Sequence, residues 1–300
     1  MGEPFAAKPL APGALLLATG ATGHTGSKLV HRLMADGFAV RAFTRSREKA
    51  QIILGADFGG EIVGGDLERE ETICSALKGC DALVSVSHVR HAPRLVAACS
   101  RTGVRRAVFT SSTRRYTRFP DDAAEAVREG EAAIRESGLD FTILRPTMIF
   151  GDDRDENLTK LIRLMRRLPF FPMPGGGRNL VQPTFVHDLV DAIVRALTND
   201  KAVGKEYDIG GPEPMAYRDM LRTIAQAMGK RLPIVPLPIA PALLLIGICE
   251  KIARHPIVIR GQILRLKEDK AVDITRARRE LGYAPTPFDE AIARKIKGQV

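Results

Sequence analysis

The chain has 300 residues, 45% of them hydrophobic, which is enough apolar sequence to bury one large core or a large and a smaller one. Its formal charge of +10 would be compatible with nucleic-acid binding, but the basic residues are scattered over several segments and aromatic residues make up only 5% of the chain. Platforms that stack single-stranded bases need aromatic side chains, so we expect no nucleic-acid partner.

The four cysteines, at 74, 80, 99 and 249, form no Cys-x-x-Cys pair and no His/Cys cluster at metal spacing. This pattern predicts free thiols in a reducing compartment, without disulfides or a bound metal. The first 12 residues carry both acidic and basic side chains and three prolines, so no secretion signal is predicted. We therefore expect a cytoplasmic protein.

Residues 14–26 read Ala-Leu-Leu-Leu-Ala-Thr-Gly-Ala-Thr-Gly-His-Thr-Gly, an apolar strand followed by three glycines spaced three apart. Gly20 permits a sharp turn, Gly23 removes a side chain that would keep a diphosphate off the backbone, and Gly26 permits close packing of helix on strand. The helix that follows offers unpaired N–H groups and the positive end of its dipole. The segment therefore predicts a dinucleotide diphosphate site.

Alternating strands and helices continue to about residue 150. An amphipathic helix ends at Asp36-Gly37, and strands are predicted over 38–44 and 61–66. Further strands are predicted over 81–87, 105–111 and 140–144, with helices over 94–101 and 122–137. This order predicts an α/β fold with a doubly wound, Rossmann-like parallel sheet, whose dinucleotide-binding domain spans 14–150.

The region 151–300 is predicted to form a smaller C-terminal lobe that is partly interleaved with the sheet and binds substrate. We expect helices over 158–168 and 188–197 and a Pro/Gly loop over 169–177. Residues 232–249 carry no charge, but four prolines leave only about two turns of helix, too short to span a bilayer. We expect a helix packed on the lobe. Peripheral docking on a membrane is the alternative, because Lys251, Arg254 and Arg260 follow.

Several of these motifs together resemble those of the extended and atypical short-chain dehydrogenases/reductases. They are residues 19–26, Gly65-Asp66-Leu67, Val108-Phe109-Thr110-Ser111-Ser112, Leu144-Arg145-Pro146 with Gly151, and Gln182-Pro183 with His187-Asp188. The tail from Asp273 to Pro285 is similar to the closing segment of the nucleotide-sugar epimerase branch. Residues 150–188 are also similar to the nucleotide-binding accessory subunit of respiratory complex I. The resemblance extends from about residue 14 to about 296.

The resemblance implies specific cofactor contacts. It places Thr22, His24 and Thr25 in the diphosphate loop, Asp66 and Leu67 beside the adenine, and Ser87 against the ribose. Pro146, directly after a strand, is expected beside the nicotinamide. For Asp66 the alternative is an ordinary Gly-Asp turn residue, and for His24 a loop residue that contributes only its backbone N–H.

The residues after the second strand predict which dinucleotide is bound. An acidic residue at this place usually holds a ribose without a 2′-phosphate, whereas a 2′-phosphate calls for a cation. The chain has Thr44-Arg45-Ser46 here, and its first acid is Glu48. Arg45 can bind phosphate through two hydrogen bonds, so we predict NADP(H) in preference to NAD(H), the alternative being that Arg45 is an exposed loop charge.

Family members that transfer hydride to or from an alcohol use a Tyr-x-x-x-Lys pair, in which the lysine lowers the pKa of the tyrosine. No tyrosine of this chain is followed by lysine at that spacing, and the positions that we align with the pair hold Ala123 and Val127. The remaining candidates for catalysis are Ser112, Thr113 and Tyr116. Arg114 and Arg115 follow the same strand and are expected to anchor an anionic substrate.

Two functions remain open from the sequence. The first is an oxidoreductase or epimerase-like enzyme that acts on a small carbonyl or nucleotide-sugar-like substrate. The second is a non-catalytic NADP(H) sensor or respiratory-complex accessory protein, since cofactor binding for structural reasons needs no proton-transfer group. Neither alternative predicts a particular oligomeric state.

Overall fold

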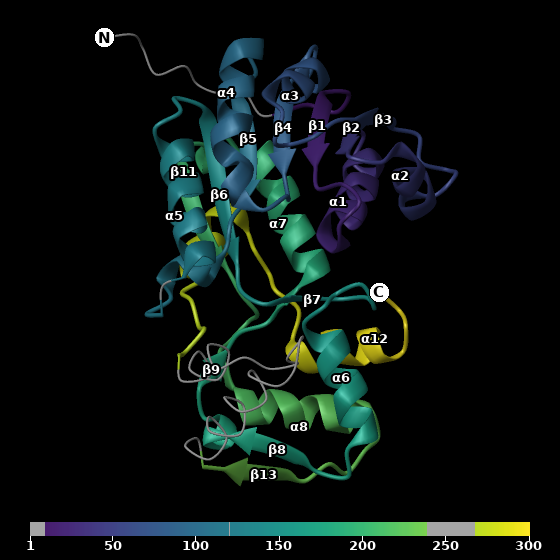
Figure 1. The fold of residues 1–300 in the computed structure, drawn as a ribbon, viewed down its shortest axis with the longest axis vertical. Coiled ribbons are helices and arrows are strands. Elements are labelled where there is room, and N and C mark those ends of the chain that lie inside the picture. Colours follow the sequence, from purple (N-terminus) through teal and green to yellow (C-terminus); the bar gives the residue numbers. More distant parts are fainter. Residues whose placement is uncertain (1–9, 120, 239–267) are drawn as a thin grey trace, which may run out of the picture.

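The computed structural model describes residues 10–119, 121–238 and 268–300. Its largest element is a seven-stranded parallel sheet in the upper part of Figure 1. The strand order is β11-β6-β5-β4-β1-β2-β3. These strands are β1 (Leu15–Thr19), β2 (Ala39–Thr44), β3 (Glu61–Gly64), β4 (Ala82–Ser85), β5 (Arg106–Thr110), β6 (Asp140–Pro146) and β11 (Lys205–Ile209). The doubly wound α/β fold is thereby confirmed.

Helices cover both faces of the sheet because its central strands are apolar on both sides. In β1, Leu16 packs with one core and its neighbour Leu17 with the other. One face is covered by α1 (His24–Ala35), α2 (Arg47–Leu54), α7 (Val186–Thr198) and α11 (Thr275–Leu281). The opposite face is covered by α3 (Glu70–Leu77), α4 (Ala92–Thr102) and α5 (Asp122–Arg135).

A smaller lobe lies below the sheet in Figure 1 and has its own apolar core. It contains α6 (Leu158–Arg167), α8 (Tyr217–Ala227), α12 (Phe288–Ile296) and three two-stranded sheets. Those sheets pair β7 (Ile149–Phe150) with β10 (Thr184–Phe185), β9 (Leu180–Val181) with β12 (Met215–Ala216), and β8 (Phe171–Pro174) with β13 (Ile234–Leu237). Phe150 contacts Phe185 and Phe288, with ring centroids 5.6 and 5.3 Å apart, and so joins the start of the lobe to the C-terminal helix.

One prediction for this lobe is corrected. The loop expected over 169–177 contains strand β8 and a short 3-10 helix, Gly175–Gly177. The proline-rich start of the 232–249 segment contains strand β13, whereas the two helical turns expected after Pro241 lie outside the described residues, as do Lys251, Arg254 and Arg260. β8 and β13 form strands because they pair with each other, which offsets the weak strand propensity of their prolines.

Neither a membrane-spanning helix nor a metal cluster occurs in the part of the chain that the structure describes. No helix there combines the length and apolar content needed to cross a bilayer. No group of His, Cys, Asp and Glu side chains in the same ranges is arranged to hold a metal ion. Cys74, Cys80 and Cys99 are free thiols, and Cys249 lies outside the described residues.

Candidate functional site

The predicted cofactor and substrate residues follow six neighbouring strands of the sheet. Because all these strands are parallel, their carboxyl ends meet at one edge. The edge carries residues 20–26 after β1, Arg45 after β2, Asp66 and Leu67 after β3, Ser87 after β4, residues 112–116 after β5, and Pro146 at the end of β6. From β1 the chain adds β2 and β3 on one side and β4, β5 and β6 on the other, so the strand order reverses between β1 and β4, which is where an open α/β sheet places its ligand.

The turn after β1 is so tight that two of its glycines could not carry a side chain. Gly20 has φ +74°, and a Cβ there would lie 2.8 Å from the backbone nitrogen of Ser87. A Cβ on Gly26 would lie only 2.0 Å from the carbonyl oxygen of Gly20. Gly23 is exposed and precedes α1 without a capping side chain, so the first N–H groups of that helix are open to a ligand. This is a cradle of the kind that accepts a diphosphate.

His24 and Lys28 of α1 contact the first turn of the lower lobe. His24 Nε2 lies 3.2 Å from Asp152 Oδ1, outside hydrogen-bonding geometry, and Lys28 pairs with the same carboxylate. Burial lowers the pKa of His24 to about 4, although Asp152 opposes this change. Burial alone would raise the pKa of Asp152, but hydrogen bonding, chiefly from Lys28, outweighs burial and lowers that pKa to about 2. His24 therefore does more than fill a loop, because it joins the glycine turn to the second lobe.

Arg45 and Asp66 follow adjacent strands at the adenine end of the site. Arg45 is exposed and makes no ion pair with another described residue. Ser46 caps α2 by accepting a hydrogen bond from the backbone of Lys49. Asp66 accepts one from the backbone N–H of Glu68, so its carboxylate also serves the turn. Leu67 is half-buried against the core under α3 and α4.

Five side-chain hydroxyls lie between the end of β5 and residue 117, and four of them donate to protein acceptors. Ser111 donates to Glu131, Thr113 to the carbonyl of Pro146, Tyr116 to the carboxylate of Asp208, and Thr117 to that of Glu268. The Ser112 hydroxyl accepts from the backbone of Arg114 and donates to no described group. Its proton is therefore available to a ligand. Tyr116 is half-exposed, and burial together with Asp208 raises the pKa of its phenol, which makes deprotonation harder.

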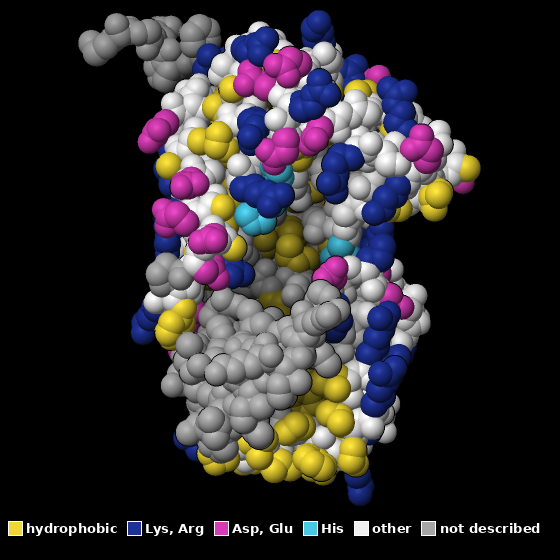
Figure 2. Space-filling view, viewed as in Figure 1, with side chains coloured by type: hydrophobic (Ala, Val, Ile, Leu, Met, Phe, Trp, Pro, Cys, Tyr) yellow, Lys and Arg dark blue, Asp and Glu magenta, His cyan; other side chains and the backbone are white. Residues whose placement is uncertain are grey.

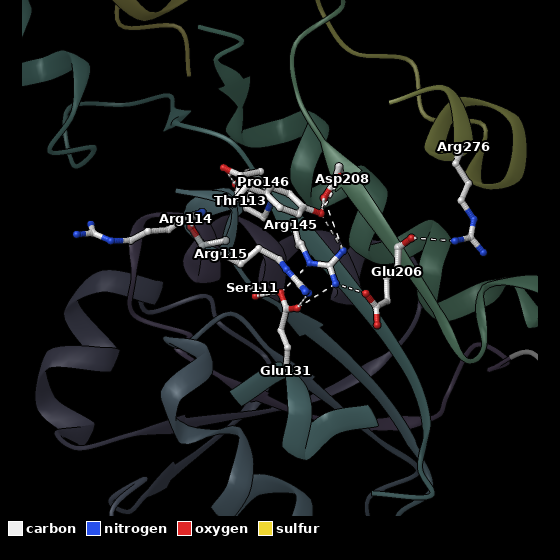
Figure 3. Close-up of polar contacts among 12 residues, drawn as sticks. Ser111, Thr113, Arg114, Arg115, Glu131, Arg145, Pro146, Glu206, Asp208 and Arg276 are labelled. Atoms are coloured by element: carbon white, nitrogen blue, oxygen red, sulfur yellow. Dashed lines mark hydrogen bonds and ion pairs between the residues drawn. The ribbon is translucent and has the colours of Figure 1, made fainter. Parts of the chain in front are cut away.

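The two arginines expected to anchor substrate both have carboxylate partners. Arg114 pairs with Asp121 and points away from the cluster in Figure 3, whereas Arg115 pairs with Glu131 and lies over the ring of Tyr116. Arg145 binds Glu131 through two nitrogens and also pairs with Glu206. Figure 3 shows Ser111, Arg115 and Arg145 converging on Glu131.

Glu131 of α5 is fully buried, although carboxylates are seldom buried without a partner. Burial alone would raise its pKa, but hydrogen bonds from Arg145 and Ser111 outweigh that effect and lower it. A signal was present in the sequence, since Arg145 directly follows Ile143 and Leu144 in a predicted strand of the sheet, and a buried guanidinium requires an acidic partner. Glu206 and Asp208, in the next strand of the sheet, supply further carboxylates and were not predicted.

The strand-end edge faces the lower lobe across a hollow. Figure 2 shows this depression between the two parts of the molecule, with hydrophobic side chains at its base and basic and acidic ones along its rim. An apolar base excludes water from a reacting group, while polar groups at the rim orient it. The arrangement can hold a flat, partly apolar ring at the carboxyl ends of β4, β5 and β6.

Two protein-family models match the chain. Residues 20–168 match a model described as NAD(P)H-binding, and residues 113–239 match the 3-beta hydroxysteroid dehydrogenase/isomerase family. The first covers the glycine turn and the sheet as far as α6, and the second runs from the residues after β5 into the lower lobe.

Curated relatives and solved structures agree with these matches. A 4-hydroxy-2-methyl-3-oxo-4-farnesyl-3,4-dihydroquinoline-1-oxide ketoreductase of Stigmatella aurantiaca is 25% identical, over 89% of this chain and 90% of the relative. The mitochondrial NADH dehydrogenase (ubiquinone) 1 alpha subcomplex subunit 9 of Arabidopsis thaliana is 26% identical, over 75% of this chain and 61% of the relative. The UDP-glucuronic acid 4-epimerase of Bacillus cereus, solved with UDP-glucuronic acid and NAD, has a similar fold, with a TM-score of 0.74 at 16% identity over 95% of this chain and 98% of that one.

Proposed function

The chain belongs to the NAD(P)-binding, extended short-chain dehydrogenases/reductases, and on that premise we propose that it transfers hydride between a nicotinamide dinucleotide and a small carbonyl-bearing substrate. The observation that carries the proposal is the glycine cradle at the switch point of the sheet. A Cβ at Gly20 or Gly26 would collide with backbone, so the turn is built for close approach by a ligand. The residues present therefore fit a dinucleotide diphosphate.

Each part of the site has a separate task in this proposal. The N–H groups at the start of α1, with Thr22 and Thr25, hold the diphosphate. Ser87 and Asp66 hold the ribose and adenine, and Pro146 borders the nicotinamide. When bound, the dinucleotide supplies or accepts the hydride. Ser112 donates its free hydroxyl proton in a hydrogen bond to the substrate oxygen and so orients the carbonyl.

Turnover by the purified protein tests this function. NADPH oxidation is followed spectroscopically with quinones, aldehydes and nucleotide sugars, and we expect at least one class to be turned over. Ser112→Ala should lower kcat about 100-fold, the usual effect of losing one polarising donor. Tyr116→Phe should retain turnover, because the phenol already donates to Asp208 and its pKa is raised.

The opposite pattern would change the assignment. A loss of 100-fold or more in Tyr116→Phe, with Ser112→Ala unaffected, would make the phenol the proton-transfer group, since positioned general acids contribute about that much. Failure of every acceptor class would contradict the enzyme. Thermal stabilisation by the dinucleotide without turnover would then favour the alternative, a non-catalytic sensor or accessory protein, which the relative from respiratory complex I supports.

The preference for NADP(H) depends on Arg45. Its guanidinium is exposed after β2 and makes no ion pair with another described residue. The first acidic residue after β2 is Glu48. Arg45→Ala should weaken NADPH binding about 10- to 100-fold, the range for a hydrogen bond to a charged group, and leave NADH binding unchanged. Calorimetry with both reduced nucleotides measures this, with Lys78→Ala as the control. Tighter binding of NADH to both wild type and Arg45→Ala would contradict the preference.

We also propose a cytoplasmic setting and a condition under which Arg114 and Arg115 contact the substrate. Free thiols at Cys74, Cys80 and Cys99 support a cytoplasmic setting. Arg114 and Arg115 would assist an anionic substrate only by exchanging their present carboxylate partners, Asp121 and Glu131, for the ligand.

A further inference from the structure

The lower lobe ends in a surface that exposes apolar side chains. Seven large hydrophobic side chains are exposed among the described residues, and four belong to this lobe: Leu164, Phe170, Val235 and Leu237, at 38–48% exposure. Figure 2 shows hydrophobic side chains gathered at the bottom of the molecule, the end opposite the sheet. Isolated surface leucines are common, but several gathered at one end indicate an interaction surface.

Hydrogen bonds and a strand pairing join the segments that carry these four residues. Lys230 donates to the backbone carbonyls of Met165 and Leu168 and so fixes the start of the 230–237 segment against the end of α6. The backbone N–H of Phe171 donates to the carbonyl of Pro233, and β13 then pairs with β8 in parallel. The segments that carry Leu164, Phe170, Val235 and Leu237 therefore lie side by side, and we call these four exposed residues together the lobe tip.

The segments that carry the lobe tip contain basic residues but no acidic ones. Neither residues 157–187 nor residues 220–249 contain an Asp or Glu, although together they contain eight Lys and Arg residues. Four of these cations flank the tip and make no ion pair with a described residue: Arg163, Arg166, Arg167 and Arg231. On the sheet domain, Arg32, Arg41 and Arg101 have carboxylate partners, whereas Arg45 has none among the described residues.

From this combination we propose that the lobe tip docks the protein peripherally on a membrane surface rich in anionic phospholipid. Exposed phenylalanine, leucine and valine enter the boundary between headgroups and acyl chains, while the flanking arginines attract lipid phosphates. Each cation near such a surface increases partitioning about fivefold, so four unpaired arginines give substantial selectivity for anionic lipid. A nucleic acid would match the charge but leave the apolar side chains without a partner. The proposal does not depend on the enzymatic function.

A fluorescent reporter tests the docking directly. The chain contains no tryptophan, so Phe170→Trp places a single indole in the lobe tip and Ile52→Trp places one on the exposed face of α2. Vesicles of equal parts phosphatidylcholine and phosphatidylglycerol should shift the emission of Phe170→Trp to the blue and leave that of Ile52→Trp unchanged. Vesicles of phosphatidylcholine alone should shift neither.

Cosedimentation of the full chain with the same vesicles separates the two contributions. Arg163→Glu/Arg167→Glu should lower the partition coefficient more than tenfold, since each reversal replaces a favourable charge by an unfavourable one. Phe170→Ser/Leu237→Ser should also lower it severalfold. The matched controls, Lys78→Glu/Lys201→Glu and Ile52→Ser, change charge and apolarity on the sheet domain and should stay within about twofold of wild type.

Three results would overturn the proposal. The first is a folded wild type that does not bind the anionic vesicles. The second is an equal loss in the Lys78→Glu/Lys201→Glu control, which would mean attraction by net charge alone. The third is that the protein binds duplex DNA more tightly than it binds vesicles. This DNA binding would be abolished in the Arg163→Glu/Arg167→Glu variant and intact in the Phe170→Ser/Leu237→Ser variant. Circular dichroism of each variant separates loss of docking from loss of fold.

Discussion

Glu131 illustrates how one buried carboxylate organises the end of the sheet. It is fully buried in α5, yet it neutralises Arg145 from β6 and Arg115 from the segment after β5 and accepts from Ser111. A buried ion pair contributes little net stability when intact, but removal of one partner leaves the other charge uncompensated. The cluster therefore fixes the position of the Ser111-Ser112 segment more than it stabilises the fold.

Glu131→Gln should lower the free energy of unfolding at neutral pH by about 3 kcal/mol, because three guanidinium groups, those of Arg115, Arg135 and Arg145, lose a shared counter-charge. The pKa of Glu131 is lowered in the folded state, so its contribution is present above about pH 4.5 and is lost as pH falls through the folded value. Wild type and variant should therefore converge as pH falls below the folded pKa of Glu131. Urea unfolding over a series from neutral to acid pH measures this. Glu129→Gln, exposed on the same helix, is the control; an equal loss in that variant would contradict the explanation.

At the scale of elements, the contact between α1 and residues 151–155 joins the two parts of the molecule. Lys28 and His24 meet Asp152, and Lys295 of α12 is buried against Asp155 and the carbonyl of Asp152. The glycine turn, the first turn of the lower lobe and the C-terminal helix thus share one polar junction. The pKa of His24 in this junction is about 4, mainly because the imidazole is buried and Lys28 already neutralises Asp152.

This burial predicts that His24 contributes to the acid sensitivity of the fold. A histidine whose folded pKa lies below its unfolded value of about 6.5 binds more protons when unfolded, so stability is present above that value and falls as pH is lowered towards 4. Wild type should lose about 2 kcal/mol more than His24→Phe between about pH 7 and pH 5. The exposed His31→Phe should behave as wild type. Parallel acid losses in wild type and His24→Phe would refute the assignment.

The sequence predicted the strands and helices of the sheet domain well, because apolar runs and glycine stops are local signals. Gly103, for example, ends α4 in the left-handed conformation that its sequence position suggests. Long-range pairings were less accessible. β8 pairs with β13 some 60 residues later, and Glu131 finds Arg145 across helix and strand. The glycine turn was predictable as a motif. The acceptors to which the hydroxyls after β5 donate were not, because they come from other strands and helices.

At the scale of the whole molecule, the two lobes have separate cores but share chain. β11 lies beyond β6 at the edge of the upper sheet, although the chain reaches it only after building β8, β9 and β10 in the lower lobe. α7 likewise packs on the core shared with α1 and β1. The boundary predicted at residue 150 is thus a boundary in sequence only, because the chain returns to the sheet twice after it, through α7 and β11 and again through α11.

This return to the sheet affects how the protein is made. A ribosome that has released only the first 150 residues has released a sheet without its outer strand and with Val108 and Leu144 lacking the helix that covers them. Such an intermediate exposes both an open strand edge and an apolar face until residues 186–209 emerge. Synthesis of the later lobe is therefore a requirement for completing the earlier one, and a fragment cut at residue 150 would be prone to aggregate.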